Sequence, residues 1–354
     1  MEYKKDLEEL VDIVIKENGS DIHLAEGRLP VIRVAGSLVP LVKRKPLTRK
    51  DMEGYLNVLL IDQSKEILNN KKQVDFAFKP ETTNSRFRGN AYVQQGFLSI
   101  ALRLIQEHIR SLKELNLPEQ LSTFARKQQG FFLVVGPSNQ GKSTTLAALI
   151  DMINEERLEH IITIEDPIEY VYKPKKSIID QREVRSDTPD FYTGLWGVFR
   201  QDVDVVMIGE MRQPETMSTA VTAAETGHLV FSTLHTNSAS QTVERIIDSF
   251  PASQQNQIRL QLAGSLIGIF SQRLIPKVSG GLTPAYELLI NNTAVANVIR
   301  DKRTHEIDTI IETSSDQGMI DLNRCLVNLV REGVISVENA YRYSYNPKTL
   351  EKML

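Results

Sequence analysis

The chain has little of the chemistry that marks secreted, zinc-binding or membrane-spanning proteins. Its 354 residues contain one cysteine, Cys325, which excludes intramolecular disulfides and any four-cysteine zinc site and is typical of a reducing compartment. No apolar run approaches the roughly 18 residues that a membrane-spanning helix needs. The N-terminal stretch MEYKKDLEEL also lacks the apolar segment of a signal peptide. We therefore expect a cytoplasmic protein without direct membrane insertion.

An excess of charge of one sign is also absent. The formal net charge is −3 and the isoelectric point is near 6.1, whereas nucleic-acid-binding domains usually carry a basic excess or stripe. The composition therefore predicts no nucleic-acid partner and weighs against a helicase or packaging motor. With 41% hydrophobic residues, a chain of this length can bury a sizeable core and is expected to form two domains.

A phosphate-binding loop is the clearest motif that is present. The sequence GPSNQGKST, residues 136–144, directly follows the apolar run 131–135 and precedes a good helical pattern over 144–153. The pattern needs glycines for backbone approach to phosphates, a lysine for the β and γ oxygens, and a hydroxyl for Mg²⁺. A plain glycine-rich turn is the alternative. The sequence predicts ATP binding by Gly136, Ser138, Asn139, Gln140, Gly141, Lys142, Ser143 and Thr144.

The pattern of apolar segments divides the chain in two. A helix over 3–18, strands near 21–24, 30–34, 74–78, 86–92 and 97–104, and a helical stretch over 48–68 predict a small α+β domain. Strands over 161–164, 205–208, 229–233 and 285–290 alternate with helices, which predicts a mostly parallel, helix-covered α/β sheet, followed by a helical tail over 293–354. We place the domains at 1–106 and 118–354, joined by a linker at 107–117.

Carboxylates follow two of the predicted strands. Glu165, Asp166 and Glu169 come after the strand 161–164, where a general base or a ligand of Mg²⁺-bound water would be useful, although a solvated acidic turn would look the same. Glu210 comes after the strand 205–208. Nucleoside triphosphatases hold Mg²⁺ with such a carboxylate and the loop hydroxyl, so Ser143 and Glu210 are the predicted metal ligands.

Two of the six histidines, His228 and His235, bracket the predicted strand 229–233. A lone histidine is more often a structural residue than a catalytic one. Because these two flank one strand of a nucleotide-binding fold, either could instead sense the γ-phosphate. The residues alone leave both interpretations open.

Taken together, the motifs resemble those of one family. Four segments resemble motifs of the secretion-superfamily ATPases, in particular the PilT-like type IV pilus retraction motors. They are the phosphate loop (GPSNQGKSTT), the aspartate box (ITIEDPIEY), the second Walker motif (VVMIGEMR) and the histidine box (AAETGHLVFSTLHTNSA). SDIHLAEGRLPVIRVAG, SRFRGNAYVQQG and AVANVIRDK resemble other parts of that family. The resemblance implies a PAS-like first domain, a RecA-like phosphate-loop core, and a homohexameric ring with ATP between subunits.

The resemblance also implies roles for single residues. It implies Glu165 as general base, Glu210 as the Mg²⁺-associated carboxylate, and His228 and His235 as nucleotide sensors or domain couplers. Arg88 and Arg103 resemble first-domain arginines that neutralise γ-phosphate charge, a large catalytic effect in phosphoryl transfer. Without the resemblance, both are ordinary arginines of alternating strands.

Several positions depart from the family pattern. Asn139 and Gln140 stand where glycine and serine are usual, and since asparagine tolerates positive φ, we expect the loop shape to survive better than its rate. Gly194 and Gly197 stand where the family has alanines in a helix. Each glycine lowers the stability of a helix by about 1 kcal/mol relative to alanine, which predicts a looser helix. Ala296 stands where the family's C-terminal motif, which is tied to retraction and not to ATP hydrolysis, normally carries an arginine.

The leading hypothesis is a cytoplasmic ring ATPase that drives type IV pilus retraction. It would act at the inner face of the membrane through an inner-membrane platform protein, alongside paralogous pilus ATPases. A pilus-assembly or type II secretion ATPase is an alternative, although those relatives are generally longer and often carry a four-cysteine motif. A catalytically weak ring subunit that regulates a paralogous motor is a second alternative, and a nucleic-acid motor a third.

Overall fold

The computed structural model describes residues 2–34, 36–83, 85–105 and 108–354. The chain forms two compact units. The first comprises the residues up to His108 together with Pro167–Val171, and the second comprises Ile109–Asp166 and Tyr172–Leu354. Residues 106 and 107, at the predicted junction of first domain and linker, lie outside the described residues. The rest of the predicted linker from Ile109 belongs to the second unit.

Over its described residues, the first unit is an antiparallel sheet with three helices. The sheet order is β3-β2-β1-β6-β5-β4, and each neighbouring pair is antiparallel. Helix α1 buries Leu7, Leu10, Val11 and Val14, the apolar positions at helical spacing. The elements are α1 (Glu2–Lys16), β1 (Gly19–Ala25), β2 (Val31–Val34), β3 (Ser37–Pro40), α2 (Arg49–Leu59), α3 (Asp62–Lys71), β4 (Gln73–Phe78), β5 (Arg86–Gln94) and β6 (Phe97–Ile105).

Two predictions for this unit need correction. The single helix expected over 48–68 is two helices, because Leu60 and Ile61 adopt extended backbone between them. The side chain of Leu60 is buried from that extended conformation, so tertiary packing overrides the local helical pattern, which has no glycine or proline at residues 60 and 61. The short strand β3 was not predicted, since all four of its residues are exposed.

The second unit is an α/β fold, as predicted. Its sheet has the order β13-β12-β7-β11-β10-β8-β9. Every neighbouring pair is parallel except β12 with β13. The strands are β7 (Gly130–Val135), β8 (His160–Glu165), β9 (Ile178–Glu183), β10 (Val205–Ile208), β11 (Leu229–Leu234), β12 (Leu266–Pro276) and β13 (Leu282–Ile290), of which β9 and β12 were not predicted.

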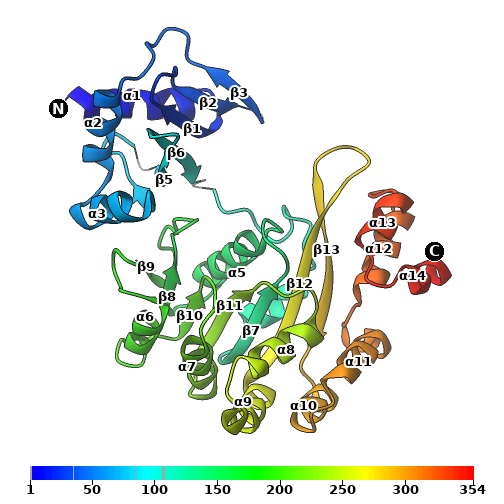
Figure 1. The fold of residues 1–354 in the computed structure, drawn as a ribbon. Coiled ribbons are helices and arrows are strands. Elements are labelled where there is room, and N and C mark those ends of the chain that lie inside the picture. The colour runs from blue at the N-terminus through cyan, green and yellow to red at the C-terminus, as the bar shows by residue number, and fades with distance from the viewer. Residues whose placement is uncertain (1, 35, 84, 106–107) are drawn as a thin grey trace. The chain divides into compact units, whose positions relative to one another are not determined.

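Helices cover both faces of this sheet (Figure 1). The helices of the unit are α4 (Leu121–Ala125), α5 (Lys142–Glu156), α6 (Phe191–Val198), α7 (Pro214–Glu225), α8 (Ala239–Asp248), α9 (Ala252–Ser265), α10 (Thr293–Arg300), α11 (Ile307–Thr313), α12 (Leu322–Arg331), α13 (Val337–Tyr343) and α14 (Pro347–Met353). The last five confirm the helical tail expected from residue 293.

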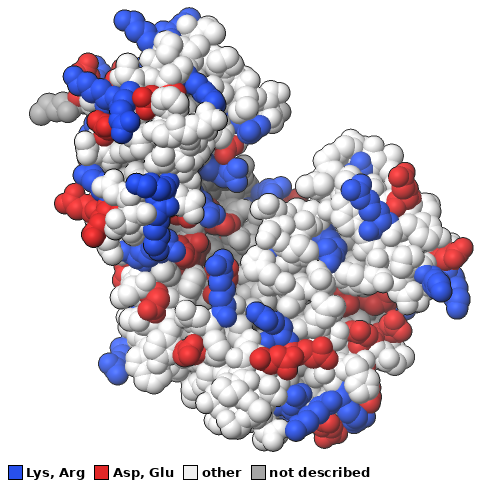
Figure 2. Space-filling model, in the orientation of Figure 1, with Lys and Arg blue, Asp and Glu red and all other residues white. Residues whose placement is uncertain are grey.

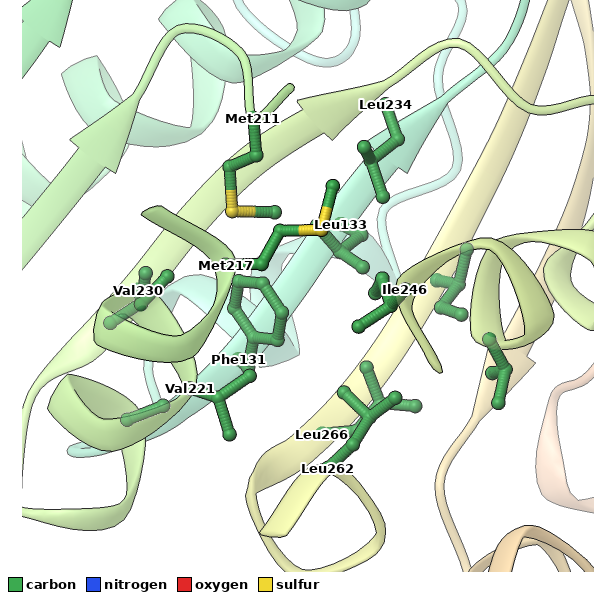
Figure 3. Packing of buried hydrophobic residues seen from close by; sticks show 14 of the residues in the cluster. Phe131, Leu133, Met211, Met217, Val221, Val230, Leu234, Ile246, Leu262 and Leu266 are labelled. Carbon is green, nitrogen blue, oxygen red and sulfur yellow. The ribbon is translucent and has the colours of Figure 1, made fainter. Parts of the chain in front are cut away.

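Alternate residues of β7 serve the two faces. Phe131, Leu133 and Val135 pack in one large cluster with residues of α6 to α11, and Figure 3 shows Met217 and Val221 of α7 beside the ring of Phe131. Phe132 points the other way, where its ring lies 4.4 Å from that of Phe124 in α4. A strand buried on both faces reads as a continuous apolar run, which is why β7 was predictable.

A separate apolar cluster attaches the C-terminal helices to the β12–β13 hairpin. Ile275 of β12 and Ala285 of β13 pack with Leu326 of α12, Ala340 of α13 and Leu350 of α14. Figure 1 shows these helices, in orange and red, along the hairpin. The tail is therefore fixed to the edge of the second unit's sheet.

No helix in the described part of the chain is long and apolar enough to cross a membrane. On the face drawn in Figure 2, basic and acidic side chains are intermixed. That mixture agrees with the near-neutral composition.

Candidate functional site

The phosphate loop leaves β7 and enters α5 with the backbone that its sequence predicts. Gly136 and Gly141 have φ of +145° and +81°, and Asn139 has φ of +61°. The expectation that asparagine supplies a left-handed residue in place of glycine is confirmed. A Cβ on Gly136 would also lie 2.4 Å from the carbonyl oxygen of Gln272, so a glycine is required there on two grounds.

Side chains of the loop and of α5 tie this segment to β12. The Gln140 Oε1 accepts the N–H of Leu274 at 2.7 Å, and the Gln140 carbonyl accepts from Gln272 Nε2 at 2.8 Å. The Thr145 hydroxyl donates to Gln272 Oε1 at 2.6 Å. Gln140, although unusual for the family, is therefore an anchor of the loop.

Lys142 lies inside the curve of the loop. Its Nζ donates to the carbonyl oxygens of Gly136 at 2.9 Å and Pro137 at 2.7 Å, and it lies 3.4 Å from His235 Nδ1. The side chain is 7% exposed. Ser143 and Thr144 follow in the first turn of α5, whose free N–H groups and dipole favour an anion.

Glu210 and His235 reach the same place from neighbouring strands. β10 and β11 are parallel to β7, so their carboxyl ends meet at one edge of the sheet. Glu210 Oε1 lies 2.8 Å from Arg212 Nη2, and Glu210 Oε2 lies 3.7 Å from His235 Nε2. The structure thus brings together Lys142, Glu210 and His235, which are far apart in the sequence.

The imidazole of His235 favours its neutral form. Burial lowers its pKa, and the positive charge of Lys142 lowers it further, while Glu210 acts in the opposite direction. A neutral ring keeps one donor and one acceptor nitrogen, so its hydrogen bonding can respond to what binds beside Lys142.

Glu165 ends β8, next to β10. Its carboxylate is buried, and Oε1 accepts from the Thr163 hydroxyl at 2.6 Å and from Gln181 Nε2 at 3.3 Å. A Cβ on Gly209 would lie 3.5 Å from the Cα of Glu165, an ordinary contact distance, so the ends of β8 and β10 lie close together. Glu165 therefore lies at the same edge as Glu210.

The other two carboxylates of the predicted acidic cluster have different partners. Asp166 Oδ2 lies 2.9 Å from Arg185 Nη2. Glu169, which belongs to the first unit, lies 3.6 Å from Arg88 Nη1. The cluster is therefore not one solvated turn, since each carboxylate is placed separately.

His228 lies at the opposite end of β11. It precedes a strand of six residues, which is about 20 Å at the usual rise. Its Nδ1 lies 3.0 Å from the carbonyl oxygen of Ala223, and its ring meets that of Phe199 edge-on at 5.6 Å. Within one chain, therefore, only His235 of the two predicted histidines lies beside the phosphate loop.

Arg88 and Arg103 face each other in the first unit. They are register partners on β5 and β6, and Arg103 Nε donates to Asp21 Oδ1 at 2.8 Å. Burial alone would raise the pKa of Asp21, but hydrogen bonds from Ser20 and Arg103 outweigh it and lower the pKa. The Arg88 and Arg103 side chains are 43% and 72% exposed, so both guanidinium groups are accessible.

The donor set suits Mg²⁺ bound together with a nucleotide. Ser143 and Glu210 offer a hydroxyl and a carboxylate, the hard oxygens that Mg²⁺ prefers, and such ions usually keep several waters besides phosphate oxygens. No group of three or more His, Cys, Asp or Glu side chains that could hold a metal occurs among the described residues. A preformed all-protein cage is not what an ATP-bound Mg²⁺ requires.

A family model described as "Type II/IV secretion system protein" matches residues 2–340. The chain belongs to this family. It is 40% identical to the type IV pilus retraction ATPase PilT of Pseudomonas aeruginosa over 335 residues, which cover 95% of this chain and 97% of that protein. It is 37% identical to the type IV pilus ATPase PilU of the same organism, over 99% of this chain and 91% of that one.

A crystal structure of the pilus retraction motor PilT with bound ADP has the same fold. It superposes with a TM-score of 0.89 at 43% identity, covering 97% of this chain and 98% of that one. The expected fold class, a phosphate-loop core with a smaller N-terminal domain, is thereby confirmed for this member of the secretion family.

One of the two glycines that depart from the secretion-family pattern, Gly194, has a packing reason in α6, whereas a Cβ on Gly197 would make only ordinary contacts. A Cβ on Gly194 would lie 3.2 Å from Ile164 of β8 and from Thr188, which is tighter than most contacts. The helix also begins at an Asp190 cap that accepts from the N–H of Thr193 at 2.7 Å. Gly194 thus lets α6 approach β8, and that contact offsets part of its cost in helix propensity.

Sequence reasoning missed three residues that adjoin the site. Gln272 and Leu274 lie on the unpredicted strand β12, so no motif pointed to them. Arg212, which pairs with Glu210, was within the quoted motif VVMIGEMR but was not singled out. The available signal for Arg212 was its opposite charge two positions after Glu210 at the end of a strand.

Proposed function

We propose that the chain is an ATPase that drives type IV pilus retraction. The observation that carries this proposal is the convergence of Lys142, Glu210 and His235 beside a well-formed phosphate loop. The near full-length match to a pilus retraction ATPase supports the biological role, since this chain spans 97% of that relative's length. We also propose that the chain has one domain at residues 1–106 and a second at 118–354, joined by a linker at 107–117.

The loop and α5 bind the triphosphate. Lys142 exchanges its bonds to the carbonyl oxygens of Gly136 and Pro137 for phosphate oxygens, and the backbone N–H groups from Ser138 to Thr144 complete the cradle. Ser143 and Glu210 hold Mg²⁺, which when bound neutralises charge on the β- and γ-phosphates.

Glu165 is proposed as the general base that orients the attacking water. Its carboxylate already accepts hydrogen bonds from Thr163 and Gln181, which fix its orientation. His235 is proposed as the nucleotide sensor. For His228, the bonds to Ala223 and the contact with Phe199 favour a supporting role at the α7–β11 turn.

The nucleoside is proposed to extend from the loop toward a small cavity. The cavity has a volume of about 70 Å³ and adjoins the loop and the start of α5, with room for part of a nucleoside. Its lining combines apolar side chains with one guanidinium and includes Arg110, Leu115, Leu117, Thr144, Leu274 and Pro284.

The working assembly is proposed to be a homohexameric ring with ATP between subunits. In such a ring, Arg88 and Arg103 of one subunit neutralise γ-phosphate charge, a role that their exposure permits. The proposed partners are an inner-membrane pilus platform protein and paralogous pilus ATPases. The protein would then act at the cytoplasmic face of the membrane, without inserting into it.

The test measures Mg²⁺-dependent ATP hydrolysis against protein concentration, with light scattering on the same samples. Turnover should rise as hexamers form and fall at least about 100-fold in Glu210→Gln. Arg88→Ala should lose turnover while still binding nucleotide. Expression in a piliated bacterium that lacks its retraction ATPase should restore twitching with the wild type and not with Glu210→Gln.

Other outcomes would point to the alternatives. Wild-type turnover no faster than that of Glu210→Gln, with tight ATP binding, would support a regulatory ring subunit. DNA binding whose log affinity falls steeply with log salt would support a nucleic-acid motor. Restored turnover without restored twitching would leave an ATPase of the assembly or secretion type.

A further inference from the structure

The loop that carries His235 is hydrogen-bonded to the C-terminal tail. The loop runs from His235, just after β11, to Ser238, whose side chain caps α8 by accepting the N–H of Gln241. On one side, His235 lies near Lys142 and Glu210. Two residues later, Asn237 faces a different set of groups.

Asn237 accepts hydrogen bonds through both of its oxygens. Its backbone carbonyl accepts from the Tyr345 hydroxyl and from the Ser271 hydroxyl, the latter at 2.7 Å. Its side-chain Oδ1 accepts from Arg273 Nη2 at 2.8 Å. The loop is thus bonded both to β12 and to a residue 108 positions further along the chain.

Arg273 joins the two partners. Its Nη2 also donates to the Tyr345 hydroxyl oxygen at 2.9 Å, and its Cζ lies 5.0 Å from the centre of the Tyr345 ring. Since the Tyr345 hydroxyl accepts from Arg273 while donating to Asn237, the three residues form a closed hydrogen-bonded triangle.

Tyr345 is held by the tail and not by the loop alone. It lies in the segment between α13 and α14. The neighbouring Ser344 donates to Asn323 Oδ1 at 2.6 Å, and Asn323 Nδ2 donates to the carbonyl of Asn346 at 3.2 Å. Asn323 belongs to α12, so a movement of the three tail helices moves Tyr345 with them.

We propose that Tyr345 and Arg273 are positioning residues that set the conformation of the His235 loop and couple the C-terminal helices to ATP turnover. The inference rests on the proposed ATPase function. Because neither residue is placed beside Lys142, their loss should change turnover and its link to the tail more than nucleotide affinity. Tyr345 is 45% exposed, so its hydroxyl can be removed without opening a core cavity.

The first test compares Tyr345→Phe with Tyr343→Phe, a tyrosine of the same tail that packs in the apolar cluster. Tyr345→Phe should lower kcat about three- to tenfold, the range expected for one lost hydrogen bond, with KM for ATP changed less than about twofold. Tyr343→Phe should retain wild-type kcat. In a His235→Ala background, Tyr345→Phe should have no further effect, because it acts through that histidine.

The second test does not depend on turnover. Hydrogen–deuterium exchange over residues 337–354 should change when Mg²⁺ and ADP are added to the wild type and to Tyr343→Phe, and should not change in Tyr345→Phe. An equal ADP response in Tyr345→Phe, or equal kcat for the two tyrosine variants, would overturn the inference while leaving the ATPase intact. A wild type that binds no ADP would overturn the proposed function and this inference together.

Discussion

The two edges of the ATPase sheet differ in the charge that they favour. At the carboxyl ends of β7, β10 and β11, burial lowers the pKa of His235 and the charge of the nearby Lys142 lowers it further. At the amino end of β8, burial lowers the pKa of His160, but hydrogen bonds to Asp180 and to the carbonyl of Asp202 outweigh it and raise the pKa. One edge therefore disfavours a protonated histidine and the other favours it.

The difference follows from what each edge must hold. An edge built for a triphosphate gathers cations and free N–H groups, and those groups repel a further proton. The amino-end edge instead holds segments of the fold together. There Arg157 donates to the carbonyl oxygens of Ala125 and Lys127 at 2.8 and 2.7 Å. A histidine's role in this protein therefore depends on which strand end it occupies.

The largest expected effect is at the centre of the carboxyl-end edge. Lys142→Ala removes the cation that reaches the phosphates, so kcat should fall at least about 100-fold. Phosphate release under saturating Mg²⁺ and ATP measures it. Lys175→Ala, which breaks ion pairs with Asp151 and Glu155 along α5, should keep turnover near the wild-type rate. Similar losses of kcat in both variants would contradict a specific role for Lys142.

The two ends of β11 provide a matched pair. His235→Ala should lower kcat roughly tenfold, because it removes the side chain between Lys142 and Glu210. His228→Ala should leave kcat within about twofold and lower the free energy of unfolding by about 1 kcal/mol through the lost bond to Ala223. Kinetics and urea denaturation separate the two, and a comparable kcat loss in His228→Ala would contradict the comparison.

Gln140 tests how firmly the phosphate loop must be attached to β12. Gln140→Ser restores the residue usual in the family but removes the acceptor for the N–H of Leu274, so KM for ATP should rise about fivefold. Gln128→Ser provides a control at the amino-end edge, where Gln128 accepts from Arg157. A Gln140→Ser enzyme that binds ATP equally well and turns over faster would show that Gln140 slows the site and is not needed as its anchor.

The smallest effect concerns the pH dependence of stability at the amino-end edge. A histidine whose pKa is raised by folding stabilises fully below its unfolded pKa, about 6.5, and loses that contribution as pH rises through the folded pKa. His160→Gln should therefore lower the free energy of unfolding by about 1 kcal/mol at pH 6 and by less at pH 9. His305→Gln, an exposed histidine, is the control. A cost that does not vary with pH would show that charge plays no part.

Much of the carboxyl-end edge could be predicted from the sequence, because each motif follows an apolar strand. Parallel strands place their carboxyl ends together, so Glu165, Glu210 and His235 had to approach the phosphate loop once the strands were identified. The same reasoning also separates the two histidines, since His235 follows β11 at its carboxyl end and His228 precedes it, although the shared motif had suggested one role for both.

The strand that anchors the loop was not predictable in this way. β12 begins at Leu266 directly after α9 ends at Ser265, with no connecting segment to announce a change of structure. Its extended backbone depends on pairing with β7, which is distant in sequence, and with β13, which follows it in a hairpin. β9 escaped prediction for another reason, since IIDQRE at the sheet edge carries little apolar pattern.

The close approach of Gly136 to Gln272 also limits how this sequence can drift. Asparagine at position 139 shows that the middle of the phosphate loop accepts a change which keeps its backbone angle. Position 136 offers no such latitude, because any side chain would meet a carbonyl oxygen of β12 whatever its chemistry. Natural variants of this protein should therefore be diverse at the loop's centre and uniform at its first residue.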